Sequence, residues 1–181
     1  MTRHETEAVP DTNFVEVTRW NLEMTSVDDH RRGRAPSVEP TVLEAQRPAP
    51  ELSAFFYRLV GGPWHWKSRL VWSDEQWNAW ANRPEQHLHT CWVDGVPAGY
   101  VELEQQGDDT EIAYFGLVEA VHGQGLGGWF LSYAIDRAWE LPTTKRVWLN
   151  TCSDDGPHAL NNYQARGFEV FSTETYERAS T

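Results

Sequence analysis

Cysteine is scarce in this sequence, and the two that occur, Cys91 and Cys152, lie far apart. Two cysteines are too few for a disulfide framework or a cysteine-rich metal site, which favours a reducing cytoplasm. The chain also lacks a long apolar run, so we expect no segment that spans a membrane. The first residues have no apolar core and do not resemble a signal peptide. These absences exclude secreted disulfide proteins and membrane-spanning proteins as classes.

Basic side chains are also in short supply, with 15 Lys and Arg against 27 Asp and Glu, for a net charge of −12. Such a surface repels a phosphate backbone, so nucleic acid is not expected as a partner. It keeps a protein soluble, and it attracts cationic substrates only weakly at cellular salt. The 181 residues suit one domain. We predict a mobile polar tail over residues 1–12 and a single domain over 13–181.

Hydrophobic periodicity and turn residues predict an alternation of strands and helices. Ser73 and Gln76 have the spacing of a capping box at a helix start. Asp94-Gly95 is a turn signal between two strand-like stretches and predicts a hairpin. Strands are expected at residues 14–20, 89–93, 96–104, 111–118 and 146–152, with a last strand that begins at residues 168–171. Helices are expected at 48–60, from 73, at 126–140 and at 157–165. This order predicts an α+β, or mixed α/β, domain of three layers.

Four glycines lie within residues 123–128, where the helix of residues 126–140 begins. Glycine lets backbone N–H groups converge on one point, and the free N–H groups of a first helical turn attract anions. The pattern predicts a phosphate-binding loop, with a glycine-rich turn that binds nothing as the alternative. The run Gly-Gln-Gly-Leu-Gly is too short for the dinucleotide fingerprint. It also lacks the Gly-Lys-Ser/Thr of a nucleoside-triphosphate loop.

Two motifs together resemble the GNAT superfamily of N-acyltransferases. Phe115-x-Leu117 followed by His122–Gly127 is similar to its acyl-CoA loop, and Ala159-x-x-x-Tyr163-x-x-x-Gly167-Phe168 is similar to its second hallmark. The resemblance extends over residues 91–171, with an acyl-CoA core of about residues 87–171, and covers the N-terminal half in outline. The segments Gly62-Pro63-Trp64 and Ala113–Leu117 are also similar to those of bacterial members, which brings no substrate with it.

This resemblance implies a mostly antiparallel twisted sheet with helices on both faces. It implies acetyl-CoA as co-substrate and transfer of its acetyl group, by direct attack in a ternary complex, to the primary amine of a small molecule. Two alternatives stay open: an acyl-CoA-binding regulatory domain without turnover, and an N-acetyltransferase of proteins or peptides. Many relatives form dimers, so a homodimer is a further implication.

Cofactor residues are also assigned by the resemblance. The expected set is Phe115, Gly116, Leu117, Val118, His122, Gly123, Gln124, Gly125, Leu126, Gly127, Gly128, Asn150, Ala159 and Asn162. The strand ending at Val118 would follow the pantetheine arm and part from the next strand. Gly116 marks a bulge, a close approach or plain packing. A backbone N–H near Gly116 or Leu117 would polarise the thioester carbonyl.

The sequence departs from the family pattern at two positions. His122 stands where Arg or Gln is usual, although backbone amides do most of the phosphate binding. Gly156 stands where an Asn often orients the cofactor, and Asn150 or Asn162 would have to compensate.

Tyr163 matches the general acid of the superfamily, since a phenol of pKa about 10 can protonate a thiolate of pKa about 8.5. The alternative is a buried tyrosine that only packs. Glu111 is the candidate base, with a solvated carboxylate as the alternative reading. Glu102 or Glu104 would act through water, and His122 is disfavoured by its place in the phosphate loop.

Tryptophan is the abundant residue, and five of the ten Trp residues lie between residues 64 and 80. A packed core is the favoured reading, and the alternative is an aromatic substrate pocket that uses Trp64, Trp66 and Glu102. Cys152 lacks a partnered base and is read as structural. His87 and His89 alternate on a strand, but no third ligand is evident, so no metal site is predicted.

Overall fold

The computed structural model describes residues 14–64 and 66–179, so the tail predicted over residues 1–12 lies outside the described residues. The strands are β1 (Phe14–Met24), β2 (Pro40–Glu44), β3 (Gln86–Val93), β4 (Val96–Gln106), β5 (Asp109–Leu117), β6 (Arg146–Cys152) and β7 (Glu169–Ala179). The helices are α1 (Pro50–Gly61), α2 (Asp74–Ala81), α3 (Leu126–Glu140) and α4 (Ala159–Ala165). Within these ranges, no helix is both long and apolar enough to cross a membrane.

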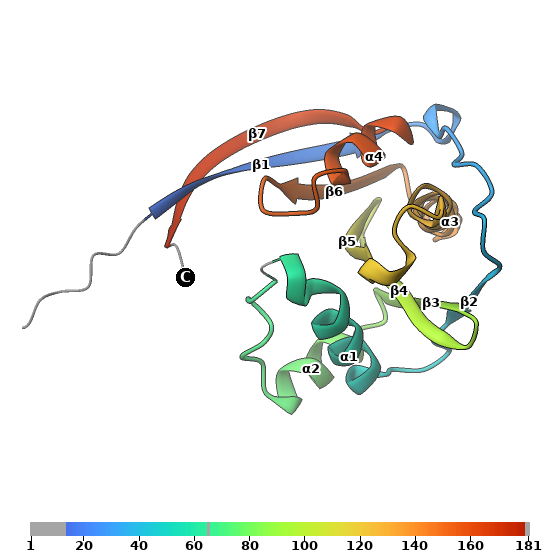
Figure 1. The fold of residues 1–181 in the computed structure, drawn as a ribbon, viewed down its shortest axis with the longest axis vertical. Coiled ribbons are helices and arrows are strands. Elements are labelled where there is room, and N and C mark those ends of the chain that lie inside the picture. Colours follow the sequence, from blue (N-terminus) through green and yellow to red (C-terminus); the bar gives the residue numbers. More distant parts are fainter. Residues whose placement is uncertain (1–13, 65, 180–181) are drawn as a thin grey trace, which may run out of the picture.

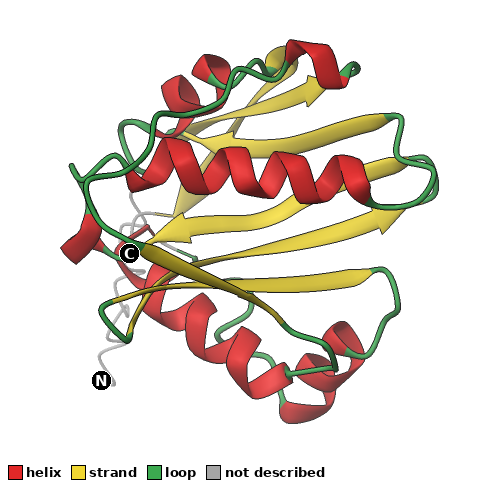
Figure 2. Cartoon of the chain, turned by 90° about the vertical axis from the view of Figure 1, so that its right-hand side faces the viewer, coloured by secondary structure: helices red, strands yellow, loops and turns green. Residues whose placement is uncertain are grey.

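The strands form a single seven-stranded sheet in the order β2-β3-β4-β5-β6-β1-β7. The pair β5–β6 is parallel, and the other five strand pairs of the described sheet are antiparallel, so the sheet is mixed and mostly antiparallel as predicted. Figure 2 shows its twist, with helices in front of the strands and behind them. In Figure 1, α1 and α2 lie together, away from α3 and α4.

Side-chain alternation along the strands builds two cores, one on each face of the sheet. On β4, Val101 and Leu103 belong to the cluster that packs against α3 and α4. Tyr100, the residue before Val101, points to the other face and belongs to the second cluster, with Phe56 and Tyr57 of α1. The sheet is therefore the middle of three layers, which confirms the predicted α+β class.

Several local predictions are confirmed. Asp94 and Gly95 both have positive φ, 51° and 78°, as a tight hairpin turn requires. Ser73 caps α2, and its side chain and that of Gln76 make the reciprocal bonds of a capping box. The bounds of α3 and β6 match those expected from the sequence.

Two edge strands differ from expectation. β2 was not predicted, and β7 covers Glu169–Ala179, where the sequence predicted that a last strand begins at residues 168–171 without indicating its length. Both strands are mostly exposed, so neither carries the apolar alternation that identifies a half-buried strand. Backbone pairing with β1, from Phe14↔Ala179 to Glu23↔Glu169, holds β7 in place instead.

The segment of residues 28–36 was expected to be a solvated loop. Its arginines are exposed, but its backbone is fixed across α3. The Gly33 N–H donates to Ser132 Oγ (2.8 Å), and the Ser37 N–H donates to the Gln124 carbonyl (2.9 Å). This loop therefore braces the start of α3 from outside.

Most important for the site is the place where β5 and β6 separate. Their ladder has three pairs and ends at Glu111↔Trp148. Beyond Glu111 the two strands diverge, as predicted for the strand that ends at Val118. A gap thus opens in the middle of the sheet, with α3 and α4 on one side and α1 and α2 on the other.

Candidate active site

A large groove with a volume of about 1430 Å³ follows this gap. It is lined by β5, the glycine-rich loop, the segment from β6 into α4, the connection between α1 and α2, and parts of β1 and β7. The groove brings together thirteen of the predicted site residues: Trp64, Trp66, Glu111, Phe115, Gly116, Leu117, His122, Gly123, Gly127, Asn150, Ala159, Asn162 and Tyr163.

Six other predicted residues do not line the groove: Glu102, Val118, Gln124, Gly125, Leu126 and Gly128. Leu126 is 1% exposed and belongs to the core, so only its backbone is left for a ligand. The Val118 N–H donates to the Ala98 carbonyl (2.8 Å), and the Gln124 carbonyl accepts from Ser37. Leu126, Val118 and Gln124 therefore support the glycine-rich loop on the side that faces away from the groove.

The glycine-rich loop delivers the start of α3 to the groove. Gly125 precedes the helix in the left-handed region (φ 76°), which glycine adopts without strain, and no side chain caps α3 in the described part of the chain. The N–H groups of the first turn therefore retain their capacity to bind an anion, aided by the helix dipole. The first turn also has no acidic residue to oppose one.

His122 is tied to the strand that precedes the loop. Its Nε2–H donates to the Leu117 carbonyl (3.2 Å), and its ring stacks with Trp64 at 6.5 Å between centroids. On the other side of the groove, the Asn162 amide donates to the Gly127 carbonyl (3.4 Å). Asn162 thus links α4 to α3, where the sequence suggested it as a compensating amide.

The backbone of β5 has one edge on β4 and one on the gap. Because the Val118 N–H donates to β4, alternation turns the N–H groups of Phe115 and Leu117 toward the gap and that of Gly116 toward β4. Of the two positions proposed to polarise a carbonyl, Leu117 therefore has the suitable direction. The register irregularity on β5 lies at Ala113, between the pairs Glu102↔Tyr114 and Leu103↔Ile112, and not at Gly116, which pairs with Tyr100.

Gly116 is a point of close approach. A side chain there would overlap Val60 of α1 and would lie beside the ring of Trp66, 3.8 Å from its Cη2. Glycine at this position therefore lets α1 pack directly on β5, which agrees with the packing reading of Gly116 and not with a bulge.

Tyr163 lies on α4 at the opposite side of the gap. It is 8% exposed, and its ring packs edge-on against Phe115 and Phe168, each at 6.3 Å between centroids. Burial, and then the nearby Asp155 carboxylate, raise the pKa of Tyr163 well above its usual range. The phenol therefore stays protonated, as a proton donor must.

Glu111 occupies the last pair of the β5–β6 ladder and accepts a hydrogen bond from the Gln106 amide (2.9 Å). Burial first, and then the Glu104 carboxylate, raise the pKa of Glu111, while Gln106 and Arg69 oppose the shift. Glu104 also lines the groove and is paired with Arg83 (2.6 Å). A carboxylate with a raised pKa is a stronger base at neutral pH than a solvated one.

Glu102 lies behind the groove wall, in a buried ion pair that the sequence did not reveal. It accepts hydrogen bonds from Ser53, from Arg69 (3.2 Å) and from the Trp80 indole (2.9 Å). The Arg69 guanidinium stacks on the rings of Trp80 (3.6 Å), Tyr114 (4.1 Å) and Trp72 (4.4 Å). Burial raises the pKa of Glu102, against the attraction of Arg69.

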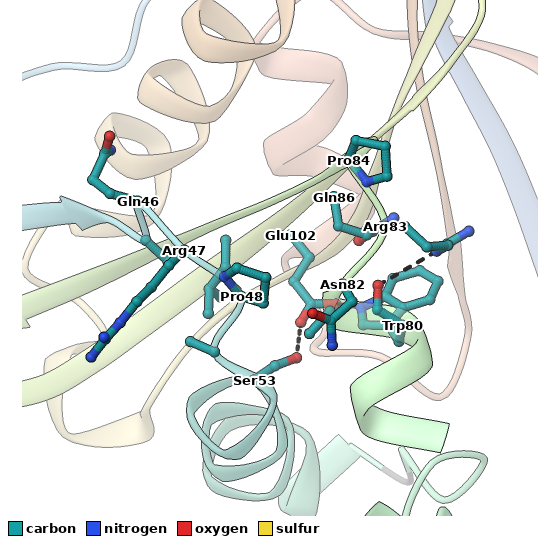
Figure 3. Close-up of a pocket in the computed structure, with 14 residues that line it drawn as sticks. Gln46, Arg47, Pro48, Ser53, Trp80, Asn82, Arg83, Pro84, Gln86 and Glu102 are labelled. Carbon is teal, nitrogen blue, oxygen red and sulfur yellow. Dashed lines mark hydrogen bonds between the residues drawn. The ribbon is translucent and has the colours of Figure 1, made fainter. Parts of the chain in front are cut away.

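A smaller pocket of about 210 Å³ lies on the Glu102 side of this ion pair. Figure 3 shows Glu102 there beside Ser53 and Trp80, with Pro48 and Asn82 around them. Arg69, by contrast, lines the large groove. The structure thus places Glu102 away from the predicted substrate contacts Trp64 and Trp66.

The tryptophan cluster divides between the two predicted roles. Trp77 is 3% exposed and belongs to the core, whereas Trp64, Trp66 and Trp80 line the groove. The Trp66 indole N–H donates to Asp155 Oδ1 (3.4 Å), which joins the connection between α1 and α2 to the turn after β6. Sequence reasoning missed Asp155 and Arg69, since no local motif marks either residue.

Cys152 lines the groove as well. Burial and the Asp155 and Asp154 carboxylates raise the pKa of the Cys152 thiol, so the structure gives it no activation as a nucleophile. His89 is 2% exposed, and its Nδ1 lies 3.0 Å from the Tyr133 hydroxyl. Burial lowers the pKa of His89 to about 4, so its ring is neutral at physiological pH.

Comparisons with known proteins identify the architecture. A sequence profile of the "Acetyltransferase (GNAT) family" matches residues 49–168. A GCN5-related N-acetyltransferase from Kribbella flavida is similar in structure, with a TM-score of 0.63 and 20% identity over 91% of this chain and 58% of that chain. The corresponding values for one from Sphaerobacter thermophilus are 0.61 and 15%, over 90% and 51%.

An aminoglycoside acetyltransferase from an uncultured soil metagenomic sample, solved with trehalose, has a TM-score of 0.59 and 13% identity, over 70% of this chain and 86% of that chain. At these identities the likeness shows the shared fold. The chain spans about half to three fifths of the length of the Kribbella and Sphaerobacter proteins. No curated protein matches it significantly.

Proposed function

This chain belongs to the GNAT acetyltransferase family, and from that premise we propose that it transfers the acetyl group of acetyl-CoA to the primary amine of a small molecule. One observation carries the proposal. The gap beside β5, the uncapped start of α3, the buried phenol of Tyr163 and the carboxylate of Glu111 all open into one groove. Acyl transfer by direct attack needs these four elements together.

The phosphates of the donor fit the start of α3, where Gly123 and Gly127 line the groove without side chains in the way. Acetyl-CoA would supply the activated thioester when bound, and coenzyme A would leave as the thiol. The gap-facing edge of β5 has the form to align an extended arm, and the Leu117 N–H is directed to polarise a carbonyl there.

Glu111 would take the ammonium proton of the acceptor, directly or through water, which leaves the amine free to attack. Tyr163, on the opposite side of the gap, would give its proton to the departing thiolate. The two groups titrate far apart because a phenol has a much higher ordinary pKa than a carboxyl, and burial raises the pKa of both Tyr163 and Glu111. One residue is thereby kept as an acid and the other as a base.

A small amine suits the acceptor end of this groove. Aromatic rings of Tyr57, Trp66 and Tyr114 line it together with the carboxylates of Glu104 and Glu111. Aromatic faces and carboxylates both attract an ammonium group. The similar aminoglycoside acetyltransferase also gives precedent for a small amine acceptor within this fold.

The proposal is tested by calorimetric titration of the purified protein with acetyl-CoA, followed by thiol-release assays on the same sample with a panel of small amines. We expect acetyl-CoA to bind and at least one amine to increase thiol release. Binding without turnover of any amine or peptide would favour an acyl-CoA-binding regulatory domain, and turnover of peptides alone would favour a protein acetyltransferase. Failure to bind acetyl-CoA would disprove the proposal.

Glu111→Gln is expected to lower kcat/KM by about tenfold at neutral pH, a modest effect because a fraction of the amine is already unprotonated. The raised pKa of Glu111 means that the wild-type rate climbs as pH rises through that pKa. In the variant this limb should disappear. At acidic pH, where Glu111 is protonated anyway, the two enzymes should become equal, which pH–rate profiles will show.

Glu104→Gln is the matched control on the neighbouring strand. Because the Glu104 carboxylate helps to raise the pKa of Glu111, its neutralisation should move the acidic limb to lower pH without removing it. A Glu111→Gln profile parallel to that of the wild type would remove Glu111 from the mechanism.

A further inference from the structure

Trp66 lines the groove beside Gly116 of β5, next to the aromatic acceptor end formed by Tyr57 and Tyr114. Its Cη2 is 3.8 Å from the position of a side chain on Gly116, and Val60 Cγ1 occupies the same space more closely. Tyr100, Gly116 and Tyr114 all face α1 at this level of the sheet. The α1 side of β5 at Gly116 is therefore covered by Val60 and Trp66.

The indole of Trp66 is held on several sides. Its ring packs against Tyr114 and Tyr57, at 5.2 and 5.6 Å between centroids, and its backbone N–H donates to the Gly61 carbonyl (3.2 Å). The indole N–H reaches Asp155. Asp155 is in turn fixed by the Thr151 hydroxyl (2.6 Å) and the Cys152 N–H (2.9 Å). Trp66 thus spans the gap from β5 to the turn after β6.

The proposed function puts the thioester carbonyl at the Leu117 N–H, one residue from Gly116. Tyr163 packs on Phe115 at the α4 side of the gap, so the sulfur leaves in that direction. An acyl chain extends from the carbonyl carbon on the side away from the sulfur. It is therefore directed toward the α1 side, where Val60 and Trp66 lie.

We propose that Trp66, with Val60, forms the end wall of the acyl pocket and restricts the donor to short acyl chains, acetyl above all. This inference rests on the proposed function. Because the indole is fixed between rings and by Asp155, it cannot turn aside without loss of those contacts. A longer chain would have to displace it, and a pocket that rejects extra methylenes discriminates by about tenfold or more.

The test measures dissociation constants of the full chain for CoA, acetyl-CoA, butyryl-CoA and hexanoyl-CoA by calorimetry, which requires no knowledge of the acceptor. In the wild type, hexanoyl-CoA should bind at least about tenfold more weakly than acetyl-CoA. Trp66→Ala should bring the two affinities together. Val60→Ala, a smaller change that threatens folding less, should restore butyryl-CoA binding while hexanoyl-CoA stays weak.

Trp72→Ala is the matched control. Trp72 is also partly buried and packs against Trp77 at 4.9 Å between centroids, but it does not line the groove. It should keep the wild-type order of affinities. Wild-type protein that binds hexanoyl-CoA as tightly as acetyl-CoA would overturn the inference alone, as would equal effects of Trp72→Ala and Trp66→Ala. If CoA itself does not bind, both the inference and the proposed function are overturned.

Discussion

Gly123→Asp is expected to lower the affinity for CoA by at least about a hundredfold while the protein stays folded. Gly123 lines the groove at the start of the phosphate loop, and a side chain there would meet no atom within 4 Å. A carboxylate would therefore occupy the space meant for phosphate. Two like charges 4 Å apart at an effective dielectric constant of 20 repel by about 4 kcal/mol, and every 1.4 kcal/mol changes a dissociation constant about tenfold.

Gly123→Asn separates charge from shape. Gly123 has a φ of 76°, and Asn and Asp are the side chains that best tolerate this left-handed region. Both variants carry a similar backbone cost and a similar volume, so only the charge differs. Calorimetry with CoA should show a small loss for Asn and a large one for Asp, and the loss for Asp should shrink as salt rises. Equal affinities in the two variants would contradict a phosphate site at this loop.

Tyr163→Phe is expected to lower kcat by about a hundredfold, within the range for a lost general acid. CoA affinity should stay near that of the wild type. The substitution retains the ring that packs against Phe115 and Phe168, and it removes only the hydroxyl. Steady-state kinetics with an amine from the panel, together with calorimetry of CoA, will separate the chemical step from binding. An unchanged kcat would remove Tyr163 from the mechanism.

The pH dependence gives a second check on Tyr163. Since burial and Asp155 raise its pKa, the phenol should stay protonated across the neutral and mildly alkaline range. The wild-type rate should therefore show no alkaline decline at the ordinary tyrosine pKa, about 10. A decline centred near that value, absent from Tyr163→Phe, would mean that the phenol is more exposed than the structure indicates.

Local features were predictable because neighbouring residues in the sequence determine them. The capping box of Ser73 and Gln76, the Asp94-Gly95 turn and the glycine-rich start of α3 each depend on a few consecutive residues. The order of most elements and the α+β class followed from these signals and from the family resemblance.

Edge strands were harder to predict. β2 and most of β7 have exposed side chains, so the apolar pattern that marks a buried strand is absent. Their hydrogen-bond partners, β3 and β1, are distant in the chain, which no local pattern records.

The sequence by itself determined where the glycine-rich loop and a family-like phenol occur, because those depend on glycine conformation and motif spacing. Only the tertiary structure decided which carboxylate faces the groove. Glu102 and Glu104 share one face of β4, yet contacts from Ser53, Arg69 and Trp80 enclose Glu102. The contact of Trp66 with Asp155 likewise joins residues 89 positions apart. Such pairs depend on how the layers pack, and packing is set by the whole chain.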